Sequence, residues 1–484
     1  MAKNNSTIFA CSECGTVERK WHGQCPGCGA WNTLVEEAPA APKSGAGARR
    51  GIGAASALPA AAGAVAEPVI LSEVRAARVR RIATGIGEFD RVLGSSATGS
   101  GVSNQGIVPG SLVLLGGSPG IGKSTLVGAA LGNLVAAGES VLYVSGEESA
   151  EQIRMRHERL GANALQVPVI AETDLDAVMA TIEASAPSVC VIDSVQTLYC
   201  SDLTGAPGSV GQVREVAARL MQLAKTREIA MLLVGHVTKE GSLAGPRVLE
   251  HLVDCVLQFE GERERSFRTL RAAKNRFGST NEVGVFEMES HGLVEIEDAS
   301  ARFVGDATAN PGSVVLAAIE GTRPMLVEIQ ALVARTEVVP PRRVANGIDR
   351  NRLALVLAVL SRHARIELSS HDVFVNVVGG VRVDEPAADL AVALAIASAA
   401  RGVPLARGGV PLACFGEIGL TGELRCVAQA DRRATEAVKF GLERLIVPGE
   451  RDRPVGIRQA LAAAFDDASG AEATDLGEKV ESLA

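Results

Sequence analysis

The chain has 484 residues, of which 47% are hydrophobic and 3% aromatic, and its formal net charge is −8. This length exceeds one compact core, so we expect two or three domains. The negative charge excludes a uniformly basic coat, though not a local basic groove. No apolar stretch has the length and purity of a membrane span, and no signal-peptide pattern precedes the first cysteines. We therefore expect a cytoplasmic protein without a membrane partner.

Four cysteines near the N-terminus form two C-x₂-C pairs, Cys11 with Cys14 and Cys25 with Cys28. Four thiolates at this spacing can close a tetrahedral shell around Zn²⁺. A redox C-x-x-C pair is the main alternative, but such motifs normally occur singly beside a βαβ unit. We expect a zinc finger over residues 1–35, followed over 36–66 by an Ala/Pro/Gly-rich segment that is typical of a flexible linker.

A glycine-rich octapeptide, Gly117-Ser-Pro-Gly-Ile-Gly-Lys-Ser124, follows an apolar run and precedes a helical pattern, as in a P-loop. Its glycines let backbone N–H groups cradle phosphate oxygens, while Lys123 would reach the β- and γ-phosphates and Ser124 would hold Mg²⁺. We therefore expect ATP and Mg²⁺ here. The expected nucleotide-binding residues are Gly117, Ser118, Pro119, Gly120, Ile121, Gly122, Lys123, Ser124, Thr125 and Asp193.

Apolar runs alternate with helical patterns after the P-loop. Such alternation predicts an α/β domain, a mostly parallel sheet with helices on both faces, and we place this domain at residues 67–300. The expected strands are 112–115, 141–144, 167–170, 189–192 and 229–234, and the expected helices are 150–160, 175–184 and 213–225.

Polar residues follow three of these strands. Asp193 ends an apolar strand, as a Walker-B aspartate does, although an aspartate there can also cap a helix. We expect strand 141–144 to lie beside the P-loop strand, so that Glu147 or Glu148 can deprotonate the attacking water. Spacing alone does not choose between them. His236 could sense the γ-phosphate or be an ordinary surface histidine.

The order of these motifs along the chain resembles that of the RecA-type ATPases. The amino-acid sequences of the motifs resemble those of the RadA (Sms) family of bacterial DNA-repair proteins. Segments that carry the likeness are Cys25-Pro-Gly-Cys28-Gly-Ala-Trp-Asn32, Thr84-Gly-Ile-Gly-Glu-Phe-Asp90, Tyr143-Val-Ser-Gly-Glu-Glu-Ser149, Ile192-Asp-Ser-Val-Gln-Thr197, Ala244-Gly-Pro-Arg-Val-Leu-Glu-His251 and Lys274-Asn-Arg-Phe-Gly278. One departure is an extension over 95–105, where the family usually has a short turn.

The resemblance implies roles that the residues alone leave open. It selects Glu147 as the base. It makes Lys274 and Arg276 candidates for a finger that reaches a neighbouring subunit's γ-phosphate or for a grip on DNA phosphates, whereas an isolated pair would usually be solvated. It also implies a homo-oligomeric ring, a hexamer, that binds single-stranded and branched DNA and works with a RecA-type recombinase.

Residues 301–484 show a different pattern, with an expected strand pair over 373–383, an Ala-rich helix over 386–399 and a hairpin around Thr421-Gly422. This α+β layout resembles the proteolytic domain of Lon protease. The serine and lysine of that protease fall at Ala387 and Asp431, which cannot form its dyad. Together with this, the resemblance to the RadA family implies an ATP-dependent DNA motor or helicase that acts in recombination and DNA repair and promotes branch migration. An ATP-dependent protease and a RecA-like autokinase are the alternatives.

Overall fold

The computed structural model describes residues 8–11, 16–27, 29–37, 80–96, 104–203, 205–235, 248–261, 267–305, 307–449 and 456–465. The chain divides into two compact units. The first comprises Met1–Gly261, Thr269–Thr280 and Met288–Glu295, and the second comprises Glu262–Arg268, Asn281–Glu287 and Ile296–Ala484. Most of the expected 36–66 linker lies outside the described residues. Within the described ranges, none of the helices combines the length and apolar character needed to cross a membrane.

The N-terminal part of the first unit is a small antiparallel sheet in the order β2-β1-β3, formed by Val17–Glu18, Ile8–Cys11 and Leu34–Glu37. Its buried cluster contains Cys11, Cys25 and Leu34, with Phe9 packed against them. So few apolar side chains make a weak core, which is why a metal is expected to contribute to folding.

A nine-stranded sheet has the order β14-β13-β12-β11-β6-β10-β9-β7-β8, and its residues belong to the first unit except Phe267–Arg268 of β12 and Val283–Glu287 of β13. Strands β11, β6, β10, β9, β7 and β8 pair in parallel, and β12 pairs antiparallel with β11. Their bounds are β6 Leu112–Gly117, β7 Val141–Ser145, β8 Val169–Ala171, β9 Val189–Asp193, β10 Ala230–Val234, β11 Cys255–Glu260, β12 Phe267–Asn275, β13 Val283–Glu289 and β14 Gly292–Glu295.

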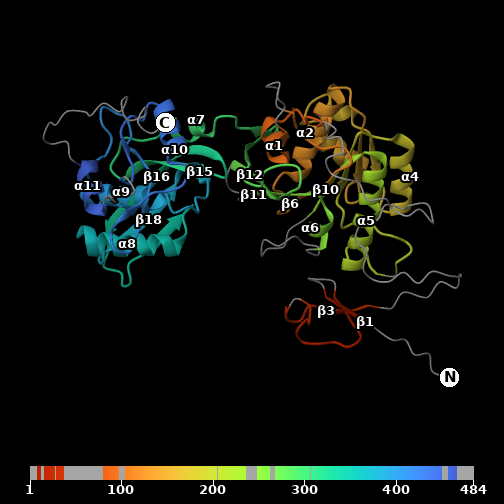
Figure 1. Ribbon diagram of the computed structural model, residues 1–484, viewed down its shortest axis with the longest axis horizontal. Helices are drawn as coiled ribbons and strands as arrows, with labels where there is room; N and C mark the ends of the chain where they lie inside the picture. Colours follow the sequence, from red (N-terminus) through yellow and green to blue (C-terminus); the bar gives the residue numbers. More distant parts are fainter. Residues whose placement is uncertain are drawn as a thin grey trace, which may run out of the picture. The chain divides into compact units, whose positions relative to one another are not determined.

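Helices cover both faces of this sheet, as the alternating pattern predicts (Figure 1). Leu112 and Leu114 belong to a buried cluster with α4, α5 and α6, while α2 contacts β6 and β7 from the other face. The helices are α1 Gly87–Leu93, α2 Lys123–Ala136, α3 Ala150–His157, α4 Leu175–Ser185, α5 Val210–Arg227 and α6 Val248–Leu252, with a 3-10 turn at Ala164–Gln166.

Two expectations about this unit need revision. Strand β7 does not lie beside the P-loop strand, because β10 and β11 flank β6 and β7 pairs with β9 and β8. Sequence periodicity identifies strands but carries little information on their order in a sheet. The 95–105 extension is also not entirely loop, because β4 (Ser95–Ser96) pairs with β5 (Asn104–Gln105) at its base; residues 97–103 lie outside the described part.

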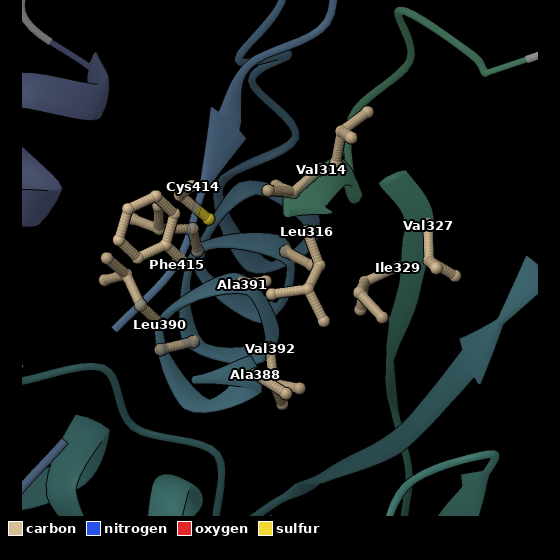
Figure 2. Packing of buried hydrophobic residues seen from close by; sticks show 14 of the residues in the cluster. Val314, Leu316, Val327, Ile329, Ala388, Leu390, Ala391, Val392, Cys414 and Phe415 are labelled. Atoms are coloured by element: carbon tan, nitrogen blue, oxygen red, sulfur yellow. The ribbon is translucent and has the colours of Figure 1, made fainter. Parts of the chain in front are cut away.

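The second unit is built on a six-stranded sheet in the order β17-β18-β16-β15-β19-β22. Helix α9 (Ala388–Arg401) is buried along its whole length from Ala388 to Ser398. Figure 2 shows Ala391 and Val392 of this helix on the side of Leu316, and Leu390 beside Phe415. The remaining elements are α7 Ala299–Val304, β15 Ser313–Glu320, β16 Arg323–Arg335, β17 Arg343–Asn346, α8 Arg350–Ala364, β18 His371–Val377, β19 Ala413–Cys414, β20 Glu417–Ile418, β21 Leu424–Arg425, α10 Ala430–Lys439, β22 Leu445–Ile446 and α11 Ile457–Phe465.

The expected Ala-rich helix and the hairpin around Thr421-Gly422 are confirmed as α9 and the β20–β21 pair. The expected strand pair over 373–383 is wrong. Strand β18 runs into a 3-10 turn at Val378–Gly380, where Gly379 takes φ 81°, a conformation that favours glycine. Val383 then bridges Ile348 instead of folding back on β18.

Candidate functional site

The P-loop joins the end of β6 to the start of α2. Gly122 precedes α2 with φ 115°, a backbone conformation that favours glycine. A Cβ on Gly117 would lie 2.8 Å from the Phe259 carbonyl oxygen, so a side chain there would clash with β11. Lys123 Nζ donates to the carbonyl oxygens of Gly117 at 2.7 Å and Ser118 at 3.1 Å. The loop therefore forms around the lysine at the amino end of a 14-residue helix.

The loop and the start of α2 offer the groups that would bind a nucleoside triphosphate and Mg²⁺. Unpaired N–H groups at the start of a helix favour anions, and Ser124 and Thr125 lie in the first turn of α2. Lys123 is only 4% exposed, and burial lowers the pKa of its ammonium group, an effect that the nearby Asp193 and Glu147 carboxylates oppose. Glu147 and Asp193 follow or end neighbouring parallel strands, β7 and β9, so both carboxylates lie at the same end of the sheet as the lysine.

Asp193 is the last residue of β9 and is 7% exposed. Its Oδ2 accepts a hydrogen bond of 2.6 Å from the Tyr143 hydroxyl of β7, and the Tyr143 oxygen accepts one of 3.1 Å from Arg156 Nη2 of α3. Burial and the Asp193 charge raise the pKa of Tyr143 well above its usual range. Sequence reasoning missed Tyr143 and Arg156. The available signal was a tyrosine inside an otherwise apolar strand, because a buried hydroxyl needs a partner.

The two adjacent glutamates after β7 have different surroundings. Glu147 Oε1 accepts a 2.5 Å hydrogen bond from Ser194 Oγ, directly after Asp193. Glu148 instead pairs with Arg156 at 2.5 Å, and its backbone N–H and carbonyl both bond Ser145 Oγ. The structure thus brings Glu147 beside Asp193 and ties Glu148 to helix α3.

Gly146 allows this close approach between β7 and the segment after β9. A Cβ at Gly146 would lie 2.0 Å from Thr197 Oγ1, which donates to the Ser194 carbonyl oxygen. Any side chain at position 146 would therefore push apart the segments that carry Glu147 and Asp193.

Lys274 and Arg276 lie at the other end of the sheet. Strand β12 runs antiparallel, so Lys274 pairs with Val256 near the start of β11. Lys274 Nζ donates to backbone carbonyls at the end of α6, at 2.6 Å to Glu250 and 2.8 Å to Val253. Burial lowers the pKa of Lys274. The lysine thus satisfies carbonyls that the end of a helix leaves without intrahelical partners.

Arg276 is the more exposed member of the pair, with 52% of its side chain accessible. Its Nη1 lies 3.0 Å from Asp254 Oδ1, while Asp254 Oδ2 accepts from the Leu112 N–H at the start of β6. The P-loop begins five residues further along that strand, about 16 Å away at the usual rise per residue. Arg276 therefore lies at the opposite edge of the sheet from the P-loop of its own chain.

The other residues of the pentapeptide also make local contacts. Asn275 Nδ2 donates to the Leu93 carbonyl at the end of α1, and the Phe277 carbonyl accepts from Arg81 Nη2. Gly278 and Gly94 approach so closely that a Cβ on Gly278 would lie 2.9 Å from the Gly94 Cα. This segment therefore joins α1, α6 and the start of the central strand.

Several expected residues fall outside the described ranges: His236, residues 244–247 of the 244–251 segment, Cys14 and Cys28. The other two expected zinc ligands, Cys11 and Cys25, are 0% and 1% exposed in one cluster. The Gly27 N–H donates to Cys25 Sγ at 3.4 Å, and such N–H contacts stabilise a metal-bound thiolate. Cys11 and Cys25 therefore have surroundings that suit thiolate ligands of a metal ion.

The two protease positions of the second unit hold no dyad. Ala387 is 1% exposed and immediately precedes α9, whereas Asp431 is exposed at the start of α10. Near them, Arg433 donates to both carboxylate oxygens of Glu385 at 2.9 and 2.5 Å. Arg433 is 2% exposed, so a buried ion pair connects the segment before α9 to α10.

Comparisons with known proteins agree with this arrangement. Residues 101–242 match the family model described as an AAA domain, residues 9–36 the rubredoxin metal binding domain, and residues 347–451 the subunit ChlI of Mg-chelatase. The chain is 49% identical over 450 residues to the DNA repair protein RadA of Bacillus subtilis, covering 93% of each chain. It is 48% identical over 471 residues to the RadA protein of Pseudomonas aeruginosa, covering 95% of this chain and 99% of that one.

Among solved structures, a KaiC-like protein of the archaeon Pyrococcus horikoshii is 21% identical with a TM-score of 0.36, and the match covers 45% of this chain and 99% of that chain.

Proposed function

The chain belongs to the RadA family of DNA repair proteins, and from this we propose that it is a DNA-dependent ATPase that moves along DNA and promotes branch migration of recombination intermediates. The observation that carries the proposal is the meeting of Lys123, Glu147 and Asp193 at the carboxyl edge of the parallel sheet. A cation for phosphate, a carboxylate for metal and a carboxylate for water are the parts that phosphoryl transfer to water needs.

In this proposal, each residue has a distinct task. The P-loop N–H groups and Lys123 bind the phosphates, and Lys123 stabilises negative charge that develops on the γ-phosphate. Ser124 and Asp193 would hold Mg²⁺, which when bound neutralises phosphate charge. Glu147 takes a proton from the attacking water, and the Ser194 hydroxyl keeps its carboxylate in place.

Arg276 is proposed to act outside its own nucleotide site. Its position at the opposite edge of the sheet supports a contact with a neighbouring subunit's γ-phosphate or with DNA phosphate, and about half of its side chain is accessible. Lys274 is proposed to support the same contact, although its ammonium group donates to backbone carbonyls at the end of α6.

The remaining parts of the proposal follow the family. They are a hexameric ring, single-stranded and branched DNA and a RecA-type recombinase as partners, a cytoplasmic location, and Zn²⁺ bound by Cys11, Cys14, Cys25 and Cys28. The proposed domains are a zinc finger at 1–35, a flexible linker at 36–66, a RecA-like ATPase domain at 67–300 and a Lon-protease-like domain at 301–484. A protease is disfavoured by Ala387 and Asp431. An autokinase would transfer labelled γ-phosphate to protein instead of water.

The test is unwinding of forked DNA with and without ATP, combined with mass measurement of the assembly. Wild-type protein should unwind the fork only with ATP. Lys123→Ala should lose hydrolysis and unwinding while keeping its thermal transition. Near-normal turnover in that variant would overturn the P-loop assignment, and ATP hydrolysis without DNA stimulation or strand separation would overturn the motor.

A further inference from the structure

A buried tyrosine connects the proposed metal-holding aspartate to a surface helix. The Tyr143 side chain is fully buried in β7, and its hydroxyl lies 2.6 Å from Asp193 Oδ2. The same oxygen is 3.1 Å from Arg156 Nη2, and Arg156 Nη1 is 2.5 Å from Glu148 Oε2. Four side chains therefore form a continuous hydrogen-bonded chain from helix α3 to the nucleotide site.

We propose that Tyr143 is a positioning residue for Asp193, holding one carboxylate oxygen so that the other is presented to Mg²⁺. The torsion that rotates a carboxylate is broad and carries little intrinsic preference, so an aspartate at a metal site needs a partner to fix it. Since this proposal rests on ATP hydrolysis at the P-loop, it deepens the proposed function.

The direction of each hydrogen bond follows from the chemistry of the partners. An arginine has only donors, so Arg156 must donate to the Tyr143 oxygen. The single phenolic hydrogen is then left for Asp193, which accepts it as a carboxylate.

Arg156 is itself fixed, which makes the chain rigid. Only 15% of its side chain is exposed, and it pairs with Glu148. The Glu148 backbone is held in turn, because its N–H donates to Ser145 Oγ and its carbonyl accepts from the same hydroxyl. The two glutamates thus have different roles. Glu148 holds Arg156, which holds Asp193 through Tyr143, whereas Glu147 accepts from the Ser194 hydroxyl.

The test compares Tyr143→Phe with Tyr199→Phe. These are the only two tyrosines of the chain, and the Tyr199 hydroxyl also bonds a carboxylate, that of Asp174. Each substitution removes one hydroxyl. Turnover of ATP is measured across a Mg²⁺ titration, and nucleotide affinity is measured separately in EDTA.

For Tyr143→Phe we expect the half-saturating Mg²⁺ concentration to rise about tenfold, within the range found when groups that orient a metal ligand are removed. Affinity for nucleotide in EDTA should change less than twofold, and excess Mg²⁺ should restore part of the turnover. Tyr199→Phe should leave the Mg²⁺ titration unchanged. A merely structural loss would lower turnover equally at all Mg²⁺ concentrations.

The proposal is overturned if Tyr143→Phe titrates with Mg²⁺ like wild type, or if both variants shift alike. If Tyr143→Phe fails to fold, Arg156→Met provides the same readout, because it frees the phenol to turn away from Asp193. It should then shift the Mg²⁺ titration by severalfold, and an unchanged titration would overturn the proposal. Absence of hydrolysis in the wild-type protein would instead refute the proposed function.

Discussion

Replacing Arg433 with methionine should destabilise the second unit strongly. The side chain is 2% exposed and satisfies Glu385 through two hydrogen bonds and the carbonyls of Ala317 and Ala428 through two more. Removing one partner of a buried pair leaves an uncompensated charge, which typically costs about 3–5 kcal/mol. Because a fifth of Glu385 remains exposed to water, we expect the lower end, about 3 kcal/mol.

The assay must report on this unit specifically. Both tryptophans lie in the first 31 residues, so intrinsic fluorescence would not follow it. Calorimetry and hydrogen exchange at the α9 amides would follow its unfolding. For a unit of this size, a loss of about 3 kcal/mol lowers the transition temperature by roughly 6–12 °C. The exposed Arg382–Asp384 pair, with 70% and 60% of the side chains accessible, is the matched control: Arg382→Met should cost less than about 1 kcal/mol.

A Glu385→Gln/Arg433→Met double variant should recover part of the loss, because it removes the stranded charge. The reasoning is refuted if Arg433→Met costs no more than Arg382→Met, or if the double variant is less stable than the wild type by the full sum of the two single losses.

Three further outcomes follow from the first unit. Glu147→Gln should lower ATP turnover by about 10²–10⁴-fold with nucleotide binding retained, whereas Glu148→Gln should lower it far less; equal losses in steady-state kinetics would contradict the assignment of the base. Arg276→Ala should keep ATP binding and lose DNA-stimulated turnover, while Lys274→Ala should also weaken hydrogen-exchange protection around α6, and unchanged values in both would remove a role for the pair. Chelation of Zn²⁺ should shift tryptophan emission and release one metal per chain in mass measurements, and Cys25→Ser should reproduce the shift; a chain that binds no zinc would favour the redox reading.

The fold of the nucleotide domain was largely predictable because buried parallel strands read as apolar runs between helical periods, and β6, β7, β9 and β10 each match an expected run within two residues. The order of those strands in the sheet was not predictable in this way, and β7 lies two strands further from β6 than expected. Pairing partners depend on contacts that periodicity does not encode.

The sequence predicts a site where a motif carries its own chemistry, as in the P-loop. It predicts less where a side chain acts with partners that are distant in sequence. Spacing alone left Glu147 and Glu148 open and only the family resemblance selected Glu147; the structure adds that Ser194 faces one and Arg156 the other. Tyr143 was missed because its partner Asp193 is 50 positions away along the chain. The hydrogen-bonding need of its hydroxyl is visible in the sequence, but the identity of the partner is not.

The separation of Arg276 from the P-loop restricts the symmetry of any assembly in which Arg276 completes a neighbour's site. The two groups lie at opposite ends of β6, so they belong to different faces of the subunit. A two-fold interface uses the same patch on both partners and would bring like edges together. Head-to-tail contacts bring unlike edges together and continue from one subunit to the next until they close. Such an assembly would be a cyclic ring or an open filament, in which every subunit both gives and receives an arginine.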